Sequence, residues 1–267
     1  AVTTAAAAAG SGPLVGLALA AAVAWANATS SAQLAAQFPE SGGTYVYGRE
    51  CLGESWGFAA GWAFVVGKTA SCAAMAITAA TYALGGEARA AQVVGLAVVG
   101  ALTVVLTRGI TKTARLARVL LTVTLACLLV TVLVIAAFTR EWAAPWAGVG
   151  DATAYGILQS AGLLFFAFAG YARIATLGEE VRAPTVTIPR AITRALGLVI
   201  ALYAVLALLF LATSGADGIA ASALPLLTAA EAADVSWAGV FVRVGATVAA
   251  LGALLGLLSG VGRTVLA

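Results

Sequence analysis

Seven long apolar stretches constrain the fold of this chain more than any other feature of its sequence. Each comes close to the roughly 20 apolar residues that an α-helix needs to cross a bilayer. Only 9% of the residues are charged, against about 25% in soluble domains, and the mean hydropathy is +1.03. Because so little charge cannot cover a soluble surface, the sequence predicts an all-α, polytopic transmembrane helix bundle. The predicted spans are 14–37, 56–84, 90–107, 116–138, 154–177, 191–213 and 237–260.

The basic residues gather on one side of the predicted bundle. If successive spans alternate in direction, the opposite side holds only Arg89 and Arg140. Because Lys and Arg concentrate in cytoplasmic loops, we predict that loops 38–55, 107–118 and 178–190 face the cytoplasm. The chain would then be a multi-pass protein of the cytoplasmic (inner) membrane. The basic side comprises Arg49, Arg108, Lys112, Arg115, Arg118, Arg173, Arg182, Arg190, Arg194 and Arg263.

The residue types present offer little support for catalysis or metal binding. The chain has no histidine, which excludes histidine-based catalysis and histidine metal sites. Cys51, Cys72 and Cys127 lack any metal-ligand spacing, so we interpret them as small packing residues. The outer connections 139–153 and 214–236 carry no recognisable chemistry, and the spans lack the acidic residues that would form a channel ring. We therefore predict no enzyme activity, catalytic residue, metal, cofactor or nucleic-acid partner.

Glycines spaced four residues apart predict close contacts between helices. They occur at Gly12 and Gly16, at Gly57 and Gly61, and in the series Gly252, Gly256 and Gly260. Lipid supplies no hydrophobic force between helices, so their interfaces favour small residues that let the backbones approach.

The fifth span has a weak point between Phe165 and Tyr171. Gly170 lowers helix stability, and the alternation of Phe with Ala makes the side-chain bulk uneven. If the helix opens here, free main-chain N–H and C=O groups would bind the carboxylate and ammonium of a substrate. A continuous helix with aromatic packing is the alternative. The predicted substrate-binding residues are Phe165, Phe166, Ala167, Phe168, Ala169, Gly170 and Tyr171, with Phe166 and Phe168 as the side chains that would cover the substrate.

Lys68 lies well inside the second span, flanked by Gly67 and Thr69. A lysine at the centre of a spanning helix costs about 2.5–3.5 kcal/mol on insertion scales, which makes it a functional hypothesis by default. The alternative is that its long side chain reaches an interface or binds a carbonyl group. Twelve residues separate it from Trp56, or roughly 18 Å of helix, which is deep for that alternative. We therefore interpret Lys68 as a candidate for ion coupling.

Four segments in order along the chain resemble one family of membrane transporters. They are PESGGTYVYGRECLG at 39–53, GWAFVVGKTAS at 61–71, RGITKTARLARVL at 108–120 and FFAFAGYARIATLGEEVRAPTVTIPRAI at 165–192. Together they resemble the amino acid–polyamine–organocation (APC) permeases, in particular bacterial amino acid permeases similar to cationic amino acid transporters. The likeness covers essentially the whole chain.

This resemblance implies a partial five-plus-five inverted-repeat (LeuT-like) transporter fold. The seven spans would be its second to eighth helices, with residues 1–12 as the tail of its first. The chain would be a single transmembrane transporter domain, residues 1–267, incomplete at both ends. The span 154–177 would be the broken helix that binds substrate. Thr124 stands where some proton-coupled relatives carry a lysine, which makes Thr124 and Lys68 the ion-coupling candidates.

The resemblance also implies the function. We expect secondary active transport of an amino acid or related amine by alternating access, coupled to protons or to sodium. A second hypothesis is a non-transporting membrane sensor or subunit, or a truncated remnant of such a permease.

Overall fold

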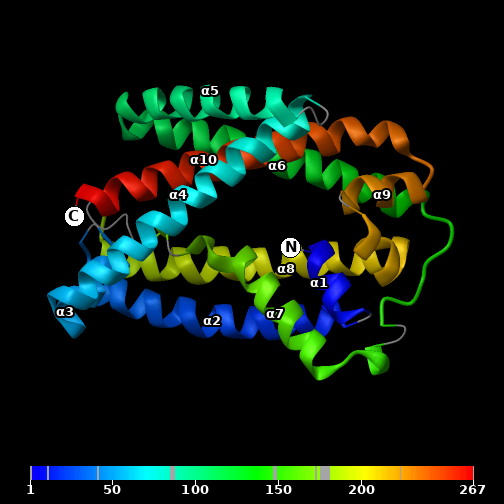
Figure 1. Cartoon of the computed structure of the whole chain (residues 1–267), viewed down its shortest axis with the longest axis horizontal. Helices are drawn as coiled ribbons and strands as arrows, with labels where there is room; N and C mark the ends of the chain where they lie inside the picture. Colours follow the sequence, from blue (N-terminus) through cyan, green and yellow to red (C-terminus); the bar gives the residue numbers. More distant parts are fainter. Residues whose placement is uncertain are drawn as a thin grey trace. The chain divides into compact units, whose positions relative to one another are not determined.

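The structure is a computed structural model that describes residues 2–10, 12–40, 42–84, 88–146, 149–171, 173–174, 181–222 and 224–266. This part of the chain is helical and contains no strand. Seven of its segments are long and apolar enough to span a membrane, which confirms the predicted all-α polytopic architecture. The α-helices are α1 (Val2–Ala9), α2 (Pro13–Gln37), α3 (Thr44–Leu52), α4 (Glu54–Leu84), α5 (Ala88–Thr107), α6 (Ile110–Phe138), α7 (Ala154–Phe168), α8 (Pro184–Ala221), α9 (Pro225–Ala232) and α10 (Gly239–Leu266) (Figure 1).

Several predicted connections between spans contain helix in the structure, and their cytoplasmic location stays a prediction. Loop 38–55 contains α3, and loop 107–118 shrinks to a link at Arg108 and Gly109 before α6 begins. Gly109 has a φ of 102°, a conformation that glycine adopts without steric cost. Loop 178–190 was predicted as the polar connection between two apolar spans. In the structure Pro184 starts α8, because proline suits the first turn of a helix, where its missing N–H needs no partner.

The span predicted at 154–177 is α-helical only to Phe168 and continues as 3₁₀ turns at 169–171 and 173–174. Residues 172 and 175–180 lie outside the described residues. The outer connection 214–236, in contrast, contains more helix than predicted, because α8 extends to Ala221 and α9 adds two further turns.

The described helices form two compact units. The first unit holds α1, α2, α7, α8, α9 and the part of α6 from Thr131 onward. The second holds α3, α4, α5, α6 up to Val130, and α10 from Val240. The single transmembrane domain over 1–267 stays a prediction.

In the first unit, α2 packs along α8 and against α7, and α1 packs against α7 and α8 (Figure 1). Glycine permits the close approach of α2 to α7, since a Cβ atom on Gly16 would lie only 2.5 Å from the Ser160 hydroxyl oxygen. A Cβ atom on Gly156 would collide with the carbonyl oxygen of Ala8, so α1 and α7 also touch through a glycine. The buried core of the unit includes Ile135, Phe210, Ile219 and Val235.

In the second unit, α3 folds back onto the start of α4. A Cβ atom on Gly57 would lie 2.7–2.8 Å from the N, Cα and Cβ atoms of Arg49. One turn later Gly61 faces the Tyr45 ring, 3.0 Å from where its Cβ would be. The glycine pair singled out in the sequence therefore lies at a helix contact. Elsewhere in the unit the buried core consists of residues from α4, α5 and α10: Cys72, Ala76, Leu102, Leu254, Leu255 and Leu257.

Tyr47 on α3 is buried, and its hydroxyl has no hydrogen-bond partner among the described residues. Its ring centroid lies 6.3 Å from that of Phe38. Burial disfavours the charged phenolate and raises the pKa of Tyr47 to about 12. The neutral hydroxyl is also desolvated without compensation, which destabilises the fold by about 1–3 kcal/mol for a typical group of this kind.

We expect Tyr47→Phe to raise the free energy of unfolding at pH 7 by up to about 1–3 kcal/mol, because it removes the unpaired hydroxyl and keeps the ring. Its pH dependence should change more clearly. The folded-state pKa of Tyr47, about 12, lies above the value of 10.0 for the free group. Between pH 10 and pH 12 the Tyr47 hydroxyl therefore ionises in the unfolded state before it does so in the folded state. The wild type should lose free energy of unfolding over this range, and the variant, which lacks the hydroxyl, should not lose this part. Thermal unfolding of the purified protein from pH 8 to 12 tests this. Equal losses of stability in the wild type and the variant above pH 10 would contradict it.

Candidate functional site

The C-terminal end of α7 lies inside the stretch predicted to bind substrate. The helix begins at Ala154, where the Thr153 hydroxyl accepts a hydrogen bond of 3.1 Å from the Gly156 N–H. It ends at Phe168, and the Ala169 N–H bonds to the Phe166 carbonyl in the tighter 3₁₀ manner. The last carbonyl groups of an α-helix have no intrahelical partner. This end of α7 therefore presents main-chain acceptors.

Tyr203 of α8 holds this helix end. Its hydroxyl donates a hydrogen bond of 3.2 Å to the Ala167 carbonyl oxygen. Its ring centroid lies 5.2 Å from that of Phe168, and the ring planes are inclined by 55°. One side chain thus satisfies a helix-end carbonyl and packs on the neighbouring aromatic ring. Sequence reasoning missed Tyr203, and its only signal was a polar tip inside an apolar span.

The seven predicted residues face different surroundings. Phe168 and Tyr171 are buried, at 2% and 8% exposure, whereas 77% of Phe166 is exposed. Phe165, Ala167 and Ala169 are half-buried, and Gly170 is exposed. The Tyr171 hydroxyl is hydrogen-bonded to the Asn27 side chain of α2. These residues share one helix end, but their binding of substrate stays a prediction.

A small cavity of about 180 Å³ adjoins the same end of α7 within the first unit. Helices α1, α2, α7 and α8 all contribute to it, and Tyr203 is the polar member of an otherwise apolar lining. Its lining residues are Val2, Ala5, Pro13, Leu17, Leu164, Ala167, Tyr203 and Ala207.

The two ion-coupling candidates belong to the second unit. The Lys68 ammonium on α4 lies 5.6 Å from the centroid of the Phe64 ring, one turn earlier on the same helix. This contact is a cation–π interaction. The Thr124 hydroxyl on α6 donates a hydrogen bond of 2.8 Å to the Leu120 carbonyl. Each side chain therefore has a partner on its own helix, and its role in ion coupling stays a prediction. Within the described residues no group of three or more His, Cys, Asp and Glu side chains could hold a metal ion.

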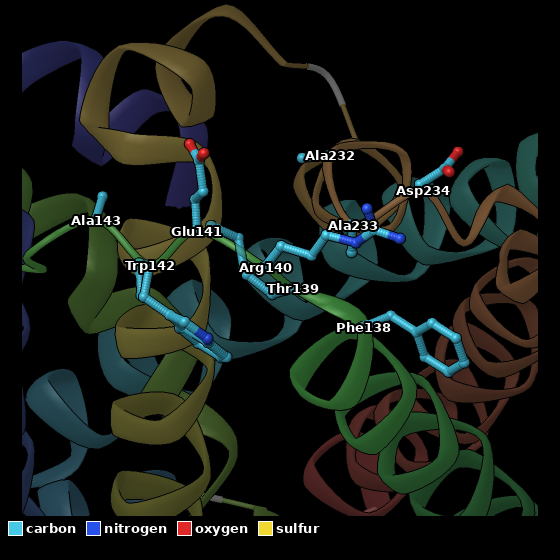
Figure 2. A pocket seen from close by; sticks show the side chains of 11 residues that line it. Phe138, Thr139, Arg140, Glu141, Trp142, Ala143, Ala232, Ala233 and Asp234 are labelled. Atoms are coloured by element: carbon cyan, nitrogen blue, oxygen red, sulfur yellow. The ribbon is translucent and has the colours of Figure 1, made fainter.

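A larger cavity, of about 600 Å³, lies in the first unit, where the segment after α6 meets α8 and the end of α9 (Figure 2). Its charged lining residues are Arg140, Glu141 and Asp234. Figure 2 shows the Arg140 side chain extending toward the turn that carries Asp234, while the Glu141 carboxylate points to a different side. No chemistry was predicted for the two connections that supply these residues.

Backbone hydrogen bonds hold both walls of this cavity. In α8 the backbone leaves helical geometry at Gly215, with φ 65° and ψ 175°. The Ala212 carbonyl instead accepts the Ala143 N–H at 2.8 Å, which fixes the segment that carries Arg140. On the other wall, α9 ends in a Schellman motif, in which the Val235 N–H bonds to the Ala230 carbonyl and the Asp234 N–H to the Glu231 carbonyl.

Asp234 occupies a backbone position that favours glycine, with a φ of 57°. We expect Asp234→Gly to raise the free energy of unfolding by about 0.5–1 kcal/mol, because glycine adopts this conformation without a steric penalty. Asp234→Asn should be nearly neutral, since asparagine tolerates the conformation about as well as aspartate. Both variants remove the charge of Asp234, but only glycine relieves the backbone strain, so their unfolding midpoints distinguish the two effects. Equal stability of the two variants would contradict the expectation.

The amino acid permease family profile matches residues 1–267, the whole chain. This chain belongs to the amino acid permease family. It is 56% identical over 270 aligned positions to an uncharacterized transporter of Mycobacterium tuberculosis, covering 100% of this chain and 60% of that protein. It is 24% identical over 287 positions to a branched-chain amino acid permease of Bacillus subtilis, covering 99% of this chain and 61% of the relative.

A third family relative is a vacuolar cationic amino acid transporter of Arabidopsis thaliana. The identity is 27% over 251 positions, which cover 85% of this chain and 39% of the relative. The chain spans about 60% of the length of the mycobacterial and Bacillus relatives. Family membership and the seven apolar helices identify a multi-pass membrane protein.

Proposed function

We propose that the full-length protein carries an amino acid across the cytoplasmic membrane by secondary active transport with alternating access. The proposal rests on the end of α7 at Phe168, which lies within the stretch 165–171 that was predicted to bind substrate. The chain that contains this helix end belongs to the amino acid permease family. Main-chain carbonyl groups at a helix end accept hydrogen bonds from an ammonium group, and main-chain N–H groups at a helix start bind a carboxylate. An amino acid carries both groups, so it needs no charged side chain from the protein.

The relatives support transport in preference to a sensor or subunit. Three of them are named for transporters or permeases. One name refers to branched-chain amino acids and another to cationic ones. Such substrates share only the α-ammonium and α-carboxylate groups, which suits recognition of those groups by main-chain atoms.

The test is uptake by the full-length protein in liposomes. A panel of radiolabelled amino acids, offered with and without gradients of pH and of sodium, should give saturable uptake of at least one substrate. Excess unlabelled substrate should compete with it. Absence of uptake across the whole panel under every gradient would favour the non-transporting alternative.

Proton coupling is part of the proposal and rests on Lys68. We expect Lys68→Met in the full-length protein to flatten the pH dependence of uptake, because methionine keeps the length and removes the charge beside Phe64. Thr124→Val provides the comparison, since it removes the hydroxyl at the second candidate position and keeps the shape. Initial uptake rates between pH 5 and 8 are the measurement. An unchanged rate and pH profile in Lys68→Met would remove Lys68 from the mechanism.

A further inference from the structure

A groove of about 550 Å³ lies in the second unit where α5, α6 and α10 meet. We call it the α10 groove. Its apolar wall includes Leu106 at the end of α5 and Leu258 and Val261 on α10. Among the described residues, its polar side consists of threonine and serine hydroxyls and one charged residue, Arg263, without a carboxylate. The described part of the groove thus combines an apolar surface with one positively charged side chain.

The groove lies at the ends of its helices. Thr107 is the last residue of α5, Thr113 belongs to the first turn of α6, and Arg263 belongs to the last turn of α10. Because Arg108 and Gly109 alone link α5 to α6, those two helix ends must face the same side of the membrane. The groove therefore lies near the boundary between the hydrocarbon core and the lipid headgroups.

Arg263 is the charged donor of the groove. It is half-buried, and its Nη1 atom donates a hydrogen bond to the Ser259 hydroxyl one turn earlier. A guanidinium group has five N–H donors in a planar fork that matches phosphate oxygens. The three lining threonines all donate their hydroxyl protons to main-chain carbonyl groups: Thr103 to Val99, Thr107 to Val104 and Thr113 to Gly109. Recognition of an anion therefore depends mainly on Arg263.

The surroundings of the groove are also positive. Arg108, Arg115 and Arg118 are exposed along the α5–α6 link and the first turns of α6. Among the described residues, these three arginines form no ion pair, whereas Arg49 of α3 pairs with Glu40 and Glu50. Each Lys or Arg near a membrane surface adds about 1 kcal/mol of attraction to anionic lipid.

We propose that the α10 groove binds an anionic phospholipid, with the phosphate on Arg263 and part of an acyl chain along Leu106, Leu258 and Val261. An apolar wall ending in a guanidinium matches a molecule with a hydrocarbon chain below a phosphate. Free phosphate shares the anionic chemistry but gains nothing from the apolar wall. The proposal does not depend on transport.

Gly262 provides a steric test that leaves the charge in place. A Cβ atom there would meet nothing within 4 Å, so the space beside Gly262 is open, and Gly262 lines the groove. Gly262→Val should therefore fill the groove without displacing neighbouring protein atoms.

The experiment measures lipid binding by the full-length protein in detergent. The thermal unfolding midpoint is followed while phosphatidylglycerol, phosphatidylcholine or inorganic phosphate is added. Phosphatidylglycerol should stabilise the wild type well beyond the other two. We expect its apparent affinity to fall about tenfold in Arg263→Gln, the loss of a charge-assisted contact, and by a similar factor in Gly262→Val. Arg263→Lys should retain most of the affinity.

The matched control is Arg118→Gln, which removes the same charge from α6 outside the groove. In detergent there is no anionic membrane surface to attract Arg118, and an exposed charge outside the groove contributes little. The affinity of this variant should therefore stay within about twofold of the wild type. Equal effects of phosphatidylglycerol and phosphatidylcholine, equal effects of lipid and inorganic phosphate, or equal losses in Arg263→Gln and Arg118→Gln would each overturn the proposal. If Arg263→Gln fails to fold, an unchanged affinity in Gly262→Val would overturn it alone. These outcomes are independent of the uptake measurements.

Discussion

Gly156→Ala is expected to force α1 away from α7 and to lower the free energy of unfolding by about 1–3 kcal/mol, the usual range for overpacking a tight contact. The added Cβ atom would collide with the carbonyl oxygen of Ala8 and would lie 3.3 Å from the Cα atom of Ala9. The Thr153 hydroxyl oxygen, at 3.1 Å, belongs to a side chain, but both neighbours on α1 are backbone atoms and cannot rotate aside. The helix itself must move, and uptake should fall with stability because α7 carries the predicted site.

Gly162 gives a matched control on the same helix. A Cβ atom there meets nothing within 4 Å, so Gly162→Ala should be neutral or should stabilise α7 by about 0.5–1 kcal/mol through helix propensity. Thermal unfolding and initial uptake rates of the two full-length variants are the measurements. Equal unfolding midpoints would show that the contact of α1 with α7 tolerates a methyl group, contrary to this expectation.

The sequence predicted helix contacts through glycine better than it predicted their partners. The spacing at Gly57 and Gly61 indicated a close approach, and both residues face α3 in the structure. Gly156 has no glycine four residues away, at 152 or 160, so spacing gave no signal for its contact with α1. A glycine's partner depends on how distant parts of the chain pack, which local spacing does not encode.

Hydropathy located the spans well, because a segment that crosses the bilayer must be long and apolar and must form its main-chain hydrogen bonds within a helix. It did not locate helix ends. The start of α6 at Ile110 includes charged residues that a hydropathy scan assigns to a loop, although backbone hydrogen bonding continues through them. The short helices α3 and α9 escaped notice for a different reason, since at 9 and 8 residues they are too short to span.

The candidate site was predictable as a stretch, but its structure was not. Uneven bulk and Gly170 indicated a weak helix near Phe168, and α-helical geometry ends there. The residue that holds this end is Tyr203, which lies 36 positions from Ala167 along the chain. A hydrogen bond at that separation follows from the packing of α8 on the end of α7. The sequence pattern within 165–171 gives no indication of this hydrogen bond.

Substitutions of two aromatic residues at the end of α7 should distinguish a role in packing from a role in substrate contact. Phe168 is 2% exposed and lies against the Tyr203 ring. We expect Phe168→Ala to lower the free energy of unfolding by about 3–5 kcal/mol, because truncation of a buried Phe leaves a cavity and removes an aromatic contact. Expression and uptake should then fall together.

Phe166 should behave in the opposite way. Its exposed fraction is 77%, and in a membrane protein such exposure to lipid carries no hydrophobic penalty. Phe166→Ala should therefore leave the unfolding midpoint within about 1 °C of the wild type, because the side chain has little packing to lose. If Phe166 covers the substrate, the same variant should raise the KM for uptake several-fold at unchanged expression. Uptake indistinguishable from the wild type would leave Phe166 as a lipid-facing residue, and substrate contact would then have to come from the main chain of 165–171 and from the buried side of α7.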